Sequence, residues 1–349
     1  MKFLYGLLIF LPVAIIGQVV GLSASLLFVF SSLAIIPLAG IMGKSTDVIS
    51  CFCGQKIGGL LNATFGNATE LIIAFVAMKA GMFDVVKASL AGSVIGNILL
   101  VLGMSMLLGG CKYKVQYFNK NSINITSSML LLAVLGLSIP AIFTHTMPEQ
   151  SLTTQFEGLS IIIAILMLLV YVMQFVFSFV THRYLYEETI STDDEEKPTM
   201  SLKVAILLLV AATVCIAILS EIFVGTIEPM AESAGLSKTF VGIILVPIIG
   251  NAAEHSSAII MAIKNKMNAA VEIALGSSLQ IILFVVPVLI LLSLFFTPMS
   301  IVFTPFELVS VGASVLIADR VSADGESNWL EGLQLVVVYV VIGAAFFFI

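Results

Sequence analysis

Charged residues are scarce in this chain of 349 residues. Asp, Glu, Lys and Arg together account for 10% of it, whereas 60% of the residues are hydrophobic and the mean hydropathy is +1.15. Soluble domains carry about 25% charged residues, so the composition excludes an ordinary soluble protein. The net charge of −6 arises partly in a single linker, so it says little about nucleic-acid or anionic lipid partners. We expect no nucleic-acid partner.

Histidine and cysteine are also few. The three histidines are scattered along the chain and no His-Glu-x-x-His sequence occurs, which excludes the usual ligand set of a zinc hydrolase. We expect no enzymatic activity and no bound cofactor. The four cysteines are interpreted as reduced structural thiols, because three of them fall on the expected cytoplasmic side.

Long apolar runs, in contrast, fill the chain from end to end. A helix crosses the hydrocarbon core of a bilayer with about 20 residues, and eleven runs reach or approach that length. The chain is therefore predicted to be an all-α integral membrane protein with eleven transmembrane helices. The runs are Leu4–Val20, Ser25–Met42, Asn62–Met78, Val85–Leu108, Ile123–Phe143, Leu159–Val180, Val204–Val224, Phe240–Ile263, Ala270–Phe295, Val302–Ala318 and Leu333–Ile349.

Lysine and arginine predict the orientation, since loops rich in these residues stay in the cytoplasm. With a cytoplasmic N-terminus, twelve of them fall on the inner side and only Lys79, Lys87 and Lys238 fall on the outer side. Eleven crossings then place the C-terminus outside the cytoplasm. We expect a multi-pass protein of the cell membrane.

Two glutamates stand out because each lies inside an apolar run. Glu70 and Glu254 both end the sequence Gly-Asn-Ala-x-Glu. A carboxylate at the bilayer centre costs about 2.5–3.5 kcal/mol on insertion scales, so such residues usually mark ion or proton pathways. A merely structural buried acid is the alternative, and the duplicated surroundings argue against it.

The two motifs belong to an internal repeat with an offset of 184 residues. Five helices separate the start of one copy from the start of the other, and because five is odd the copies are predicted to insert in opposite orientations. We expect an extra N-terminal helix in 1–22, five-helix repeats in 23–182 and 204–349, and an acidic cytoplasmic linker in 183–203. The linker is interpreted as a solvated connection, with Ca²⁺ sensing as the alternative. The aligned pairs are Gly66 with Gly250, Asn67 with Asn251, Glu70 with Glu254, Gly92 with Gly276 and Ser93 with Ser277.

Glycine precedes each glutamate by about one helical turn. Gly66 and Gly250, the second reinforced by Pro247, weaken the helix at the membrane centre. An opened helix leaves carbonyl oxygens without N–H partners, which a membrane tolerates where they line a cavity or bind an ion. Ca²⁺ takes about six to eight oxygen ligands from carboxylates, amides and backbone carbonyls. The predicted ligand set is Glu70, Glu254, Asn67, Asn251, Asn97, Gln280, Ser93 and Ser277, with the backbone at Gly66 and Gly250.

The amides and hydroxyls of this set have a second interpretation. They would also suit interhelical hydrogen bonds in a tightly packed bundle. The functional pairing of Asn97 with Gln280 is the weaker inference, because the repeat alignment sets Asn97 opposite Ile281.

Further titratable groups flank the second motif. His255 directly follows Glu254 and has no counterpart in repeat one. It is interpreted either as a group that tunes the glutamate and takes part in proton coupling, or as a side chain with a polar contact elsewhere. Glu221, Glu228 and Glu232 form either an outer mouth for the ion or a solvated acidic surface.

Charge neutrality predicts how transport would be coupled. Two nearby carboxylates in a low-dielectric site disfavour double ionisation, so the empty site is expected to hold protons. Ca²⁺ displaces them, and the Ca²⁺-loaded and doubly protonated pairs are both neutral. If only neutral forms change sides, one Ca²⁺ exchanges for about two protons by alternating access.

Both motifs resemble those of the cation/proton exchanger family, the Ca²⁺/H⁺ antiporters of the Ca²⁺/cation antiporter superfamily. The similarity runs through Gly66-Asn67-Ala68-Thr69-Glu70 and the second motif with its histidine, continues into the two Gly-Ser segments, and with the topology covers nearly the whole chain. The resemblance implies a sodium/calcium exchanger-like fold, the two glutamates as the central Ca²⁺ and proton site, and a homotrimer.

Two other functions stay open. Sodium/calcium exchangers share the architecture, but their motifs resemble Ser/Thr-rich sequences with a proline before the acid, where Asn67 and Asn251 stand here. A passive cation channel would use the same oxygens as a filter. The asparagines favour protons over sodium, and inverted repeats with broken helices favour an antiporter that expels Ca²⁺ from the cytosol.

Overall fold

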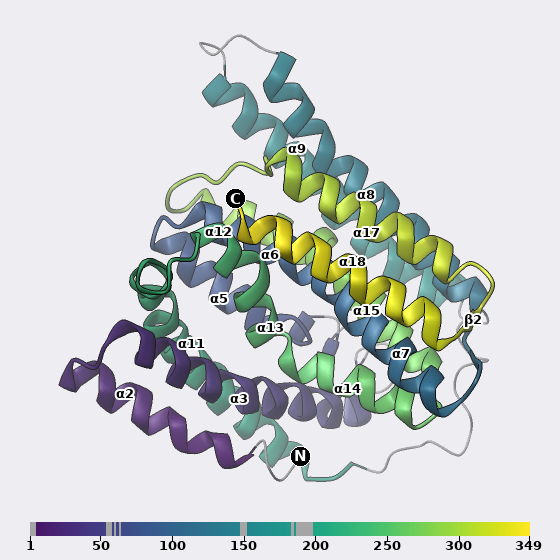
Figure 1. Cartoon of the computed structure of the whole chain (residues 1–349), viewed down its shortest axis with the longest axis horizontal. Helices are drawn as coiled ribbons and strands as arrows, with labels where there is room; N and C mark the ends of the chain where they lie inside the picture. The colour runs from purple at the N-terminus through teal and green to yellow at the C-terminus, as the bar shows by residue number, and fades with distance from the viewer. Residues whose placement is uncertain are drawn as a thin grey trace. The chain divides into compact units, whose positions relative to one another are not determined.

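Helices dominate the computed structural model, which describes residues 5–53, 58, 61–62, 64–146, 152–182, 185 and 198–349 (Figure 1). The acidic run of the expected linker lies outside the described residues. The elements in chain order are η1 (Leu7–Ile9), α2 (Phe10–Val20), α3 (Ala24–Cys53), α5 (Ala68–Lys79), α6 (Phe83–Ile95), η2 (Gly96–Val101), α7 (Leu102–Lys112), β1 (Gln116–Tyr117), α8 (Lys120–Thr146), α9 (Leu152–Val176), η4 (Phe177–Thr181), α11 (Leu202–Ala234), α12 (Lys238–Phe240), η5 (Val241–Leu245), α13 (Val246–Gly250), α14 (Ala252–Ile263), α15 (Met267–Gln280), η6 (Ile281–Val285), α16 (Val286–Ser293), α17 (Pro305–Val321), β2 (Glu326–Ser327) and α18 (Trp329–Phe347).

Seven helices among the described residues are long and apolar enough to cross a membrane. An eighth candidate is the pair Lys238–Gly250 and Ala252–Ile263, whose halves are bent by 62° at a short break. The expectation of a helical chain rich in apolar spans is confirmed, and the number eleven stays a prediction. The seven spans are Ala24–Cys53, Phe83–Lys112, Lys120–Phe143, Gly158–Thr181, Leu202–Ala234, Met267–Ser293 and Trp329–Phe347.

Two helices run farther than hydropathy predicts. Helix α3 continues to Cys53 and α11 continues to Ala234, about three turns beyond the apolar runs that predicted them. Hydropathy marks the part of a helix that suits hydrocarbon, whereas the backbone hydrogen bonds continue where polar side chains reach water. As a result Glu228 and Glu232 lie within α11 rather than in a loop.

The chain divides into two compact units, which are described separately. One comprises Met1–Ser89, Thr192–Glu254 and Phe346–Ile349, and the other comprises Leu90–Ser191 and His255–Ala345. Each unit therefore contains segments from both expected repeats.

In the first unit, α3 and α11 pack against each other in opposite directions (Figure 1). The hydroxyls of Ser25 and Ser233 lie 3.0 Å apart near one end of the pair. Farther along, the hydroxyl of Thr213 donates to the sulfur of Met42 at 3.6 Å. An early residue of each helix thus meets a later residue of the other, which is the relation expected of the first helices of two inverted repeats.

The second unit also pairs elements that correspond in the two repeats. Helix α8 packs on α17, and α15 packs on η2. The turn η2 belongs to the span of repeat one that corresponds to the span of α15 in repeat two. The short strands β1 and β2 pair antiparallel, with Gln116 opposite Ser327. Sequence reasoning did not predict these two strands.

Side chains around β1 hold the C-terminal end of α14. The amide nitrogen of Gln116 donates to the carbonyl of Ala262 at 2.9 Å and to Asn265 Oδ1 at 2.9 Å. Lys112 Nζ donates to the carbonyl of Ile263 at 2.9 Å. These bonds satisfy carbonyls that the end of a helix leaves without partners, and they hold the C-terminal end of α14 within the second unit.

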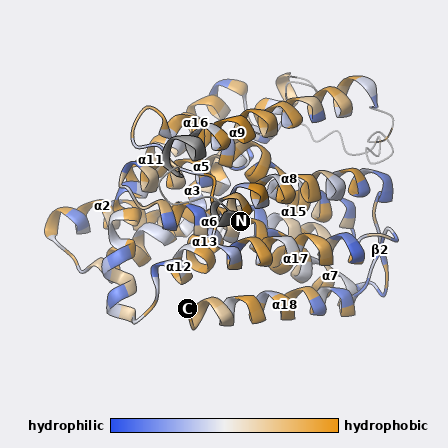
Figure 2. Ribbon diagram, turned by 90° about the horizontal axis from the view of Figure 1, so that it is seen from above, coloured by the Kyte–Doolittle hydropathy of each residue, from blue (hydrophilic) through white to orange (hydrophobic). Residues whose placement is uncertain are grey.

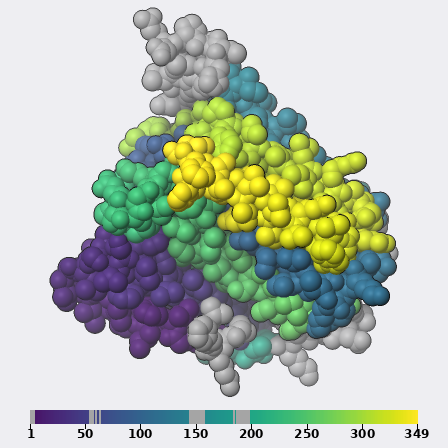
Figure 3. Space-filling view, in the orientation of Figure 1, coloured from purple at the N-terminus to yellow at the C-terminus, as the bar shows by residue number. Residues whose placement is uncertain are grey.

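The outer faces of the helices are apolar. Figure 2 shows hydrophobic residues along the helices and hydrophilic ones mainly at helix ends and turns. Helix α18 lies at the surface along much of its length (Figure 3), where Val337, Val340 and Val341 are more than half exposed. Soluble monomers rarely expose so continuous an apolar surface, so lipid is the expected surrounding.

Helices α7 and α18 approach closely at a pair of glycines. A Cβ atom on Gly332 would lie 2.2 Å from the backbone nitrogen of Leu107 and 2.6 Å from the carbonyl oxygen of Gly103. Helix backbones in membranes come together in this way where a side chain is absent.

We expect Gly332→Ala to destabilise the protein by about 1–3 kcal/mol or more, because the added methyl group meets rigid backbone. Thermal unfolding in detergent should show a lower melting temperature than the parent. Gly158→Ala is the control, since nothing lies within 4 Å of a Cβ at that position. An unchanged melting temperature for Gly332→Ala would contradict the close crossing.

Candidate functional site

The second motif lies at a break in a helix. Helix α13 ends at Gly250, Asn251 has non-helical dihedral angles, and α14 begins at Ala252 with Glu254 in its first turn. The two helices are bent by 62° at this point. The break falls where Gly250 and Pro247 were expected to weaken the helix.

The first motif has the same local form. Gly66 and Asn67 form a turn, and α5 begins at Ala68 with Glu70 in its first turn. The N–H of Leu71 donates to the carbonyl of Asn67 at 3.0 Å, which makes Asn67 the residue from which the helix starts. Each glutamate is therefore placed near the positive end of a helix dipole, which favours an anionic side chain there.

Glu70 is buried against the break in the other motif. Its side chain is 7% exposed and its Oε2 atom has no hydrogen-bond partner. Its Oε1 atom would lie 3.0 Å from a Cβ atom at Gly250, so the carboxylate touches the backbone at the bend. Glu254 is close enough for the two carboxylates to repel each other electrostatically. The structure thus brings the two repeated glutamates together within the first unit.

The two motif asparagines are also buried. Asn67 and Asn251 are each 1% exposed. The Nδ2 atom of Asn251 donates to the carbonyl of Pro247 at 3.0 Å, which fixes the orientation of the amide. The first unit therefore holds two carboxylates and two amides at paired helix breaks.

A second group of polar residues lies in the second unit. Asn97 Nδ2 donates to Ser277 Oγ at 3.1 Å, and Asn97 Oδ1 lies 3.1 Å from His255 Nε2. All three side chains are buried. Because the amide nitrogen of Asn97 faces the serine, its oxygen accepts from a protonated Nε2. His255 thus makes a polar contact with Asn97, and a polar contact elsewhere was one of its two interpretations.

Both Gly-Ser segments lead into π-helical turns. Residues Gly96–Val101 form η2 and Ile281–Val285 form η6, at nearly equivalent positions of the two repeats. Such turns are rare and occur frequently at functional sites. The extra residue in each turn breaks the regular spacing of the helix near Asn97 and Gln280. Hydropathy alone carries no signal for this irregularity.

The predicted ligand positions divide between the units. Each group is built from both repeats, and the chain passes from one unit to the other between Glu254 and His255. The first unit holds Gly66, Asn67, Glu70, Gly250, Asn251 and Glu254, and the second holds Ser93, Asn97, Ser277 and Gln280.

The three acids before the second motif are not buried with these groups. Glu221 is exposed, whereas Glu228 forms an ion pair with Lys238 and lines a cavity with Asp84. Sequence reasoning missed Lys238 and Asp84 as partners of these acids. The signal available was that both were expected on the same side of the membrane as Glu228.

The donor set suits a hard cation. Among the described residues no three His, Cys, Asp or Glu side chains gather as a metal cluster, so a cation here would take carboxylate, amide and backbone oxygens. Ca²⁺ accepts such a set, whereas Zn²⁺ prefers histidine and cysteine.

Comparison with known proteins identifies the family. The sodium/calcium exchanger protein family matches residues 23–180 and 204–348, which together make up most of the chain. This chain belongs to that family. The two matched ranges also correspond closely to the two expected repeats.

Relatives of this exchanger-family protein match it over nearly its whole length. It is 45% identical to the Ca²⁺/H⁺ antiporter of Aphanothece halophytica, over 99% of this chain and 96% of that protein. It is 47% identical to the Ca²⁺/H⁺ antiporter ChaA of Bacillus subtilis (strain 168), over 96% of each chain.

Solved structures agree with the fold. The structure of native YfkE has a TM-score of 0.85 and 43% identity, and covers 99% of this chain and 100% of its own. A structure of the sodium-calcium exchanger NCX_Mj has a TM-score of 0.56 at 17% identity, over 91% of this chain and 96% of its own. The second likeness is one of fold alone.

We expect Ser277→Ala to destabilise the exchanger-family protein by about 1–3 kcal/mol, since it leaves the buried amide nitrogen of Asn97 without an acceptor. Thermal unfolding is the measurement. Ser278→Ala is a matched control, because the hydroxyl of that neighbouring buried serine donates to the carbonyl of Ala274 in its own helix. Equal melting temperatures for the two variants would contradict a structural role for the Asn97 bond.

Proposed function

We propose that this chain is a Ca²⁺/H⁺ antiporter that works by alternating access and expels Ca²⁺ from the cytosol. The observation that carries the proposal is the approach of the Glu70 carboxylate to the helix break at Gly250, with Glu254 within electrostatic range. Relatives at 42–47% identity that are named Ca²⁺/H⁺ antiporters support the same substrates.

The paired carboxylates explain why the two ions compete. Two ionised carboxylates in a water-poor site repel each other and lose hydration. A divalent cation neutralises both charges at once, and protons on the carboxylates do the same. Binding of one ion therefore displaces the other. The buried amides of Asn67 and Asn251, together with carbonyls at the two breaks, complete the proposed oxygen shell.

Protons are favoured over sodium as the coupling ion. The named Ca²⁺/H⁺ antiporters match this chain at far higher identity than the sodium-calcium exchanger does. The motifs of sodium-coupled exchangers resemble Ser/Thr-rich sequences. Asn67 and Asn251 stand at the corresponding positions of this chain. The chain is proposed to move ions rather than to catalyse a reaction.

The proposed topology has eleven helices, with the N-terminus in the cytoplasm and the C-terminus outside it. Contacts within each unit support it, because residues expected on the same side of the membrane meet. Lys112 meets the end of α14, both expected inside, and Lys238 meets Glu228, both expected outside. The division into an extra helix and two inverted repeats follows from this topology, and the homotrimer stays a prediction.

Glu70→Gln and Glu254→Gln should each abolish Ca²⁺/H⁺ exchange, because a single carboxylate can no longer balance a divalent cation. The measurement is Ca²⁺ uptake into proteoliposomes driven by a pH step, without sodium. Glu326→Gln is the control, since this exposed glutamate lies on β2, and it should exchange like the parent.

Three outcomes would contradict the proposal. Exchange that persists in either buried-glutamate variant would mean that the pair of carboxylates is not required for transport. Uptake that needs sodium would assign the sodium-coupled function instead. Ca²⁺ flux with single-channel currents and no proton counter-transport would assign a channel.

Gly250→Ala tests the closeness of the two motifs. Its methyl group would meet Glu70 Oε1 at 3.0 Å, so the carboxylate must shift from its place. We expect an apparent KM for Ca²⁺ raised by about tenfold, a loss of about 1.4 kcal/mol of binding, in a protein that remains folded. Gly43→Ala in α3 is the control, since its Cβ would meet nothing within 4 Å. An unchanged KM in Gly250→Ala would mean that the bend does not form part of the ion site.

A further inference from the structure

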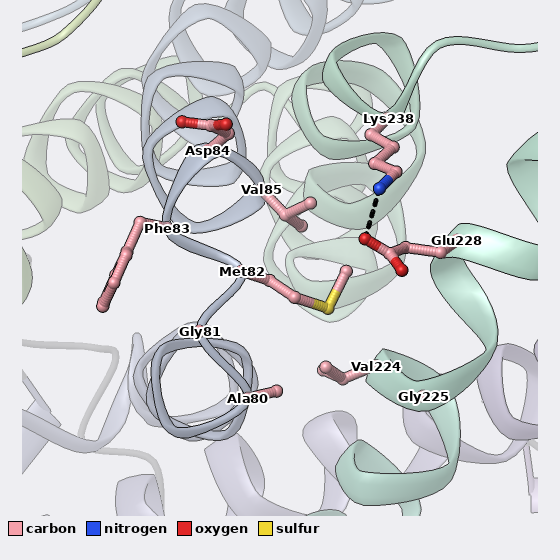
Figure 4. Close-up of a pocket in the computed structure, with 10 residues that line it drawn as sticks. All are labelled: Ala80, Gly81, Met82, Phe83, Asp84, Val85, Val224, Gly225, Glu228 and Lys238. Carbon is pink, nitrogen blue, oxygen red and sulfur yellow. Dashed lines mark hydrogen bonds and ion pairs between the residues drawn. The ribbon is translucent and has the colours of Figure 1, made fainter. Parts of the chain in front are cut away.

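A cavity of about 390 Å³ lies in the first unit, and its described lining does not include the paired glutamates. The turn between α5 and α6 forms one wall, and α11 with the start of α12 forms the other (Figure 4). Apolar side chains of Met82, Val85 and Val224 line it together with three charged ones, Asp84, Glu228 and Lys238. All of these residues fall on or next to the outer side in the proposed topology.

Lys238 is the positive group of this cavity. Its ammonium donates a hydrogen bond to the carboxylate of Glu228, as the dashed line in Figure 4 marks. Asp84 and Glu232 also act on the ammonium electrostatically. The cavity lining thus carries two carboxylates, Asp84 and Glu228, against one ammonium, so it keeps an excess of negative charge.

The ion pair contributes little to folding. The side chains of Lys238 and Glu228 are 49% and 48% exposed, and solvated pairs of this kind add little stability. Their larger effect is on the electrostatic potential of the cavity, because a concave surface lined by one sign of charge concentrates ions of the opposite sign.

One continuous stretch of the chain runs from the cavity to the proposed ion site. Lys238 is the first residue of α12, which continues through η5 and α13 to Gly250 and the helix break. The cavity therefore lies at the outer end of the broken span that carries the second motif.

We propose that Lys238 is a tethered cation that sets the apparent Ca²⁺ affinity of this outer cavity. Its ammonium occupies the carboxylates that would otherwise attract a divalent cation arriving from that side. An arriving Ca²⁺ must displace the ammonium from Glu228, so the lysine weakens binding from the outside and favours release there. This inference rests on the proposed exchange function.

The test compares four variants in membrane vesicles of both orientations, with Ca²⁺ added at one face or the other. Lys238→Gln should lower the apparent KM for Ca²⁺ at the cavity face by about threefold or more, because a nearby positive charge is removed. The KM at the opposite face should not change. Glu228→Gln should raise the KM at the cavity face, and Lys238→Arg should behave like the parent.

Lys79→Gln is the matched control. Lys79 is an exposed lysine on the same proposed side that does not line the cavity, so its removal changes the net charge equally without changing the cavity. The KM values of Lys79→Gln at both faces should match those of the parent. The effect of Lys238→Gln should also shrink as ionic strength rises, since salt screens exposed charges.

Two results would overturn the inference while leaving the exchange function in place. One is a Lys238→Gln variant indistinguishable from Lys79→Gln. The other is a shift of Lys238→Gln and Glu228→Gln in the same direction, which would mean that the pair acts as a structural link between α11 and α12. A parent protein without exchange driven by a pH step would instead overturn the proposed function.

Discussion

The mutual repulsion of two buried carboxylates is the constraint on which the account depends. Glu70 and Glu254 come from opposite halves of the chain, yet they lie within electrostatic range in one compact unit. Such a pair is stable in a water-poor interior only when its charge is balanced. Ca²⁺ and protons are the two ways of balancing it that the antiporter proposal uses, and each excludes the other.

The helix breaks follow from this constraint. A continuous helix at Gly250 would keep its carbonyls bonded internally, and a side chain there would displace the Glu70 carboxylate. The turns at Gly66-Asn67 and Asn251 instead begin new helices directly before the glutamates. Within the second unit, bonds from Gln116 and Lys112 satisfy carbonyls at the C-terminal end of α14.

Much of this arrangement could be predicted, because it depends on motifs that can be read directly from the sequence. Duplicated motifs in apolar runs predicted the paired glutamates and the breaks at glycine, and the structure has both features. The contact between His255 and Asn97 could not be predicted, because it depends on how helices distant in sequence pack. The same holds for the π-helical turns η2 and η6 and for the β1–β2 pair, whose residues carry no distinct pattern. The predicted end of α11 was wrong, because hydropathy marks only the apolar part of a helix and polar residues continue this one into water.

The most direct test of charge balance is the number of protons released when Ca²⁺ binds to the purified protein. It can be measured in detergent solution near neutral pH, with a pH indicator in weak buffer and in parallel by calorimetry in buffers of different ionisation enthalpy. The account predicts release of about two protons for each Ca²⁺ bound, because metal and protons occupy the same carboxylates. Stoichiometric Ca²⁺ binding without proton release would contradict it.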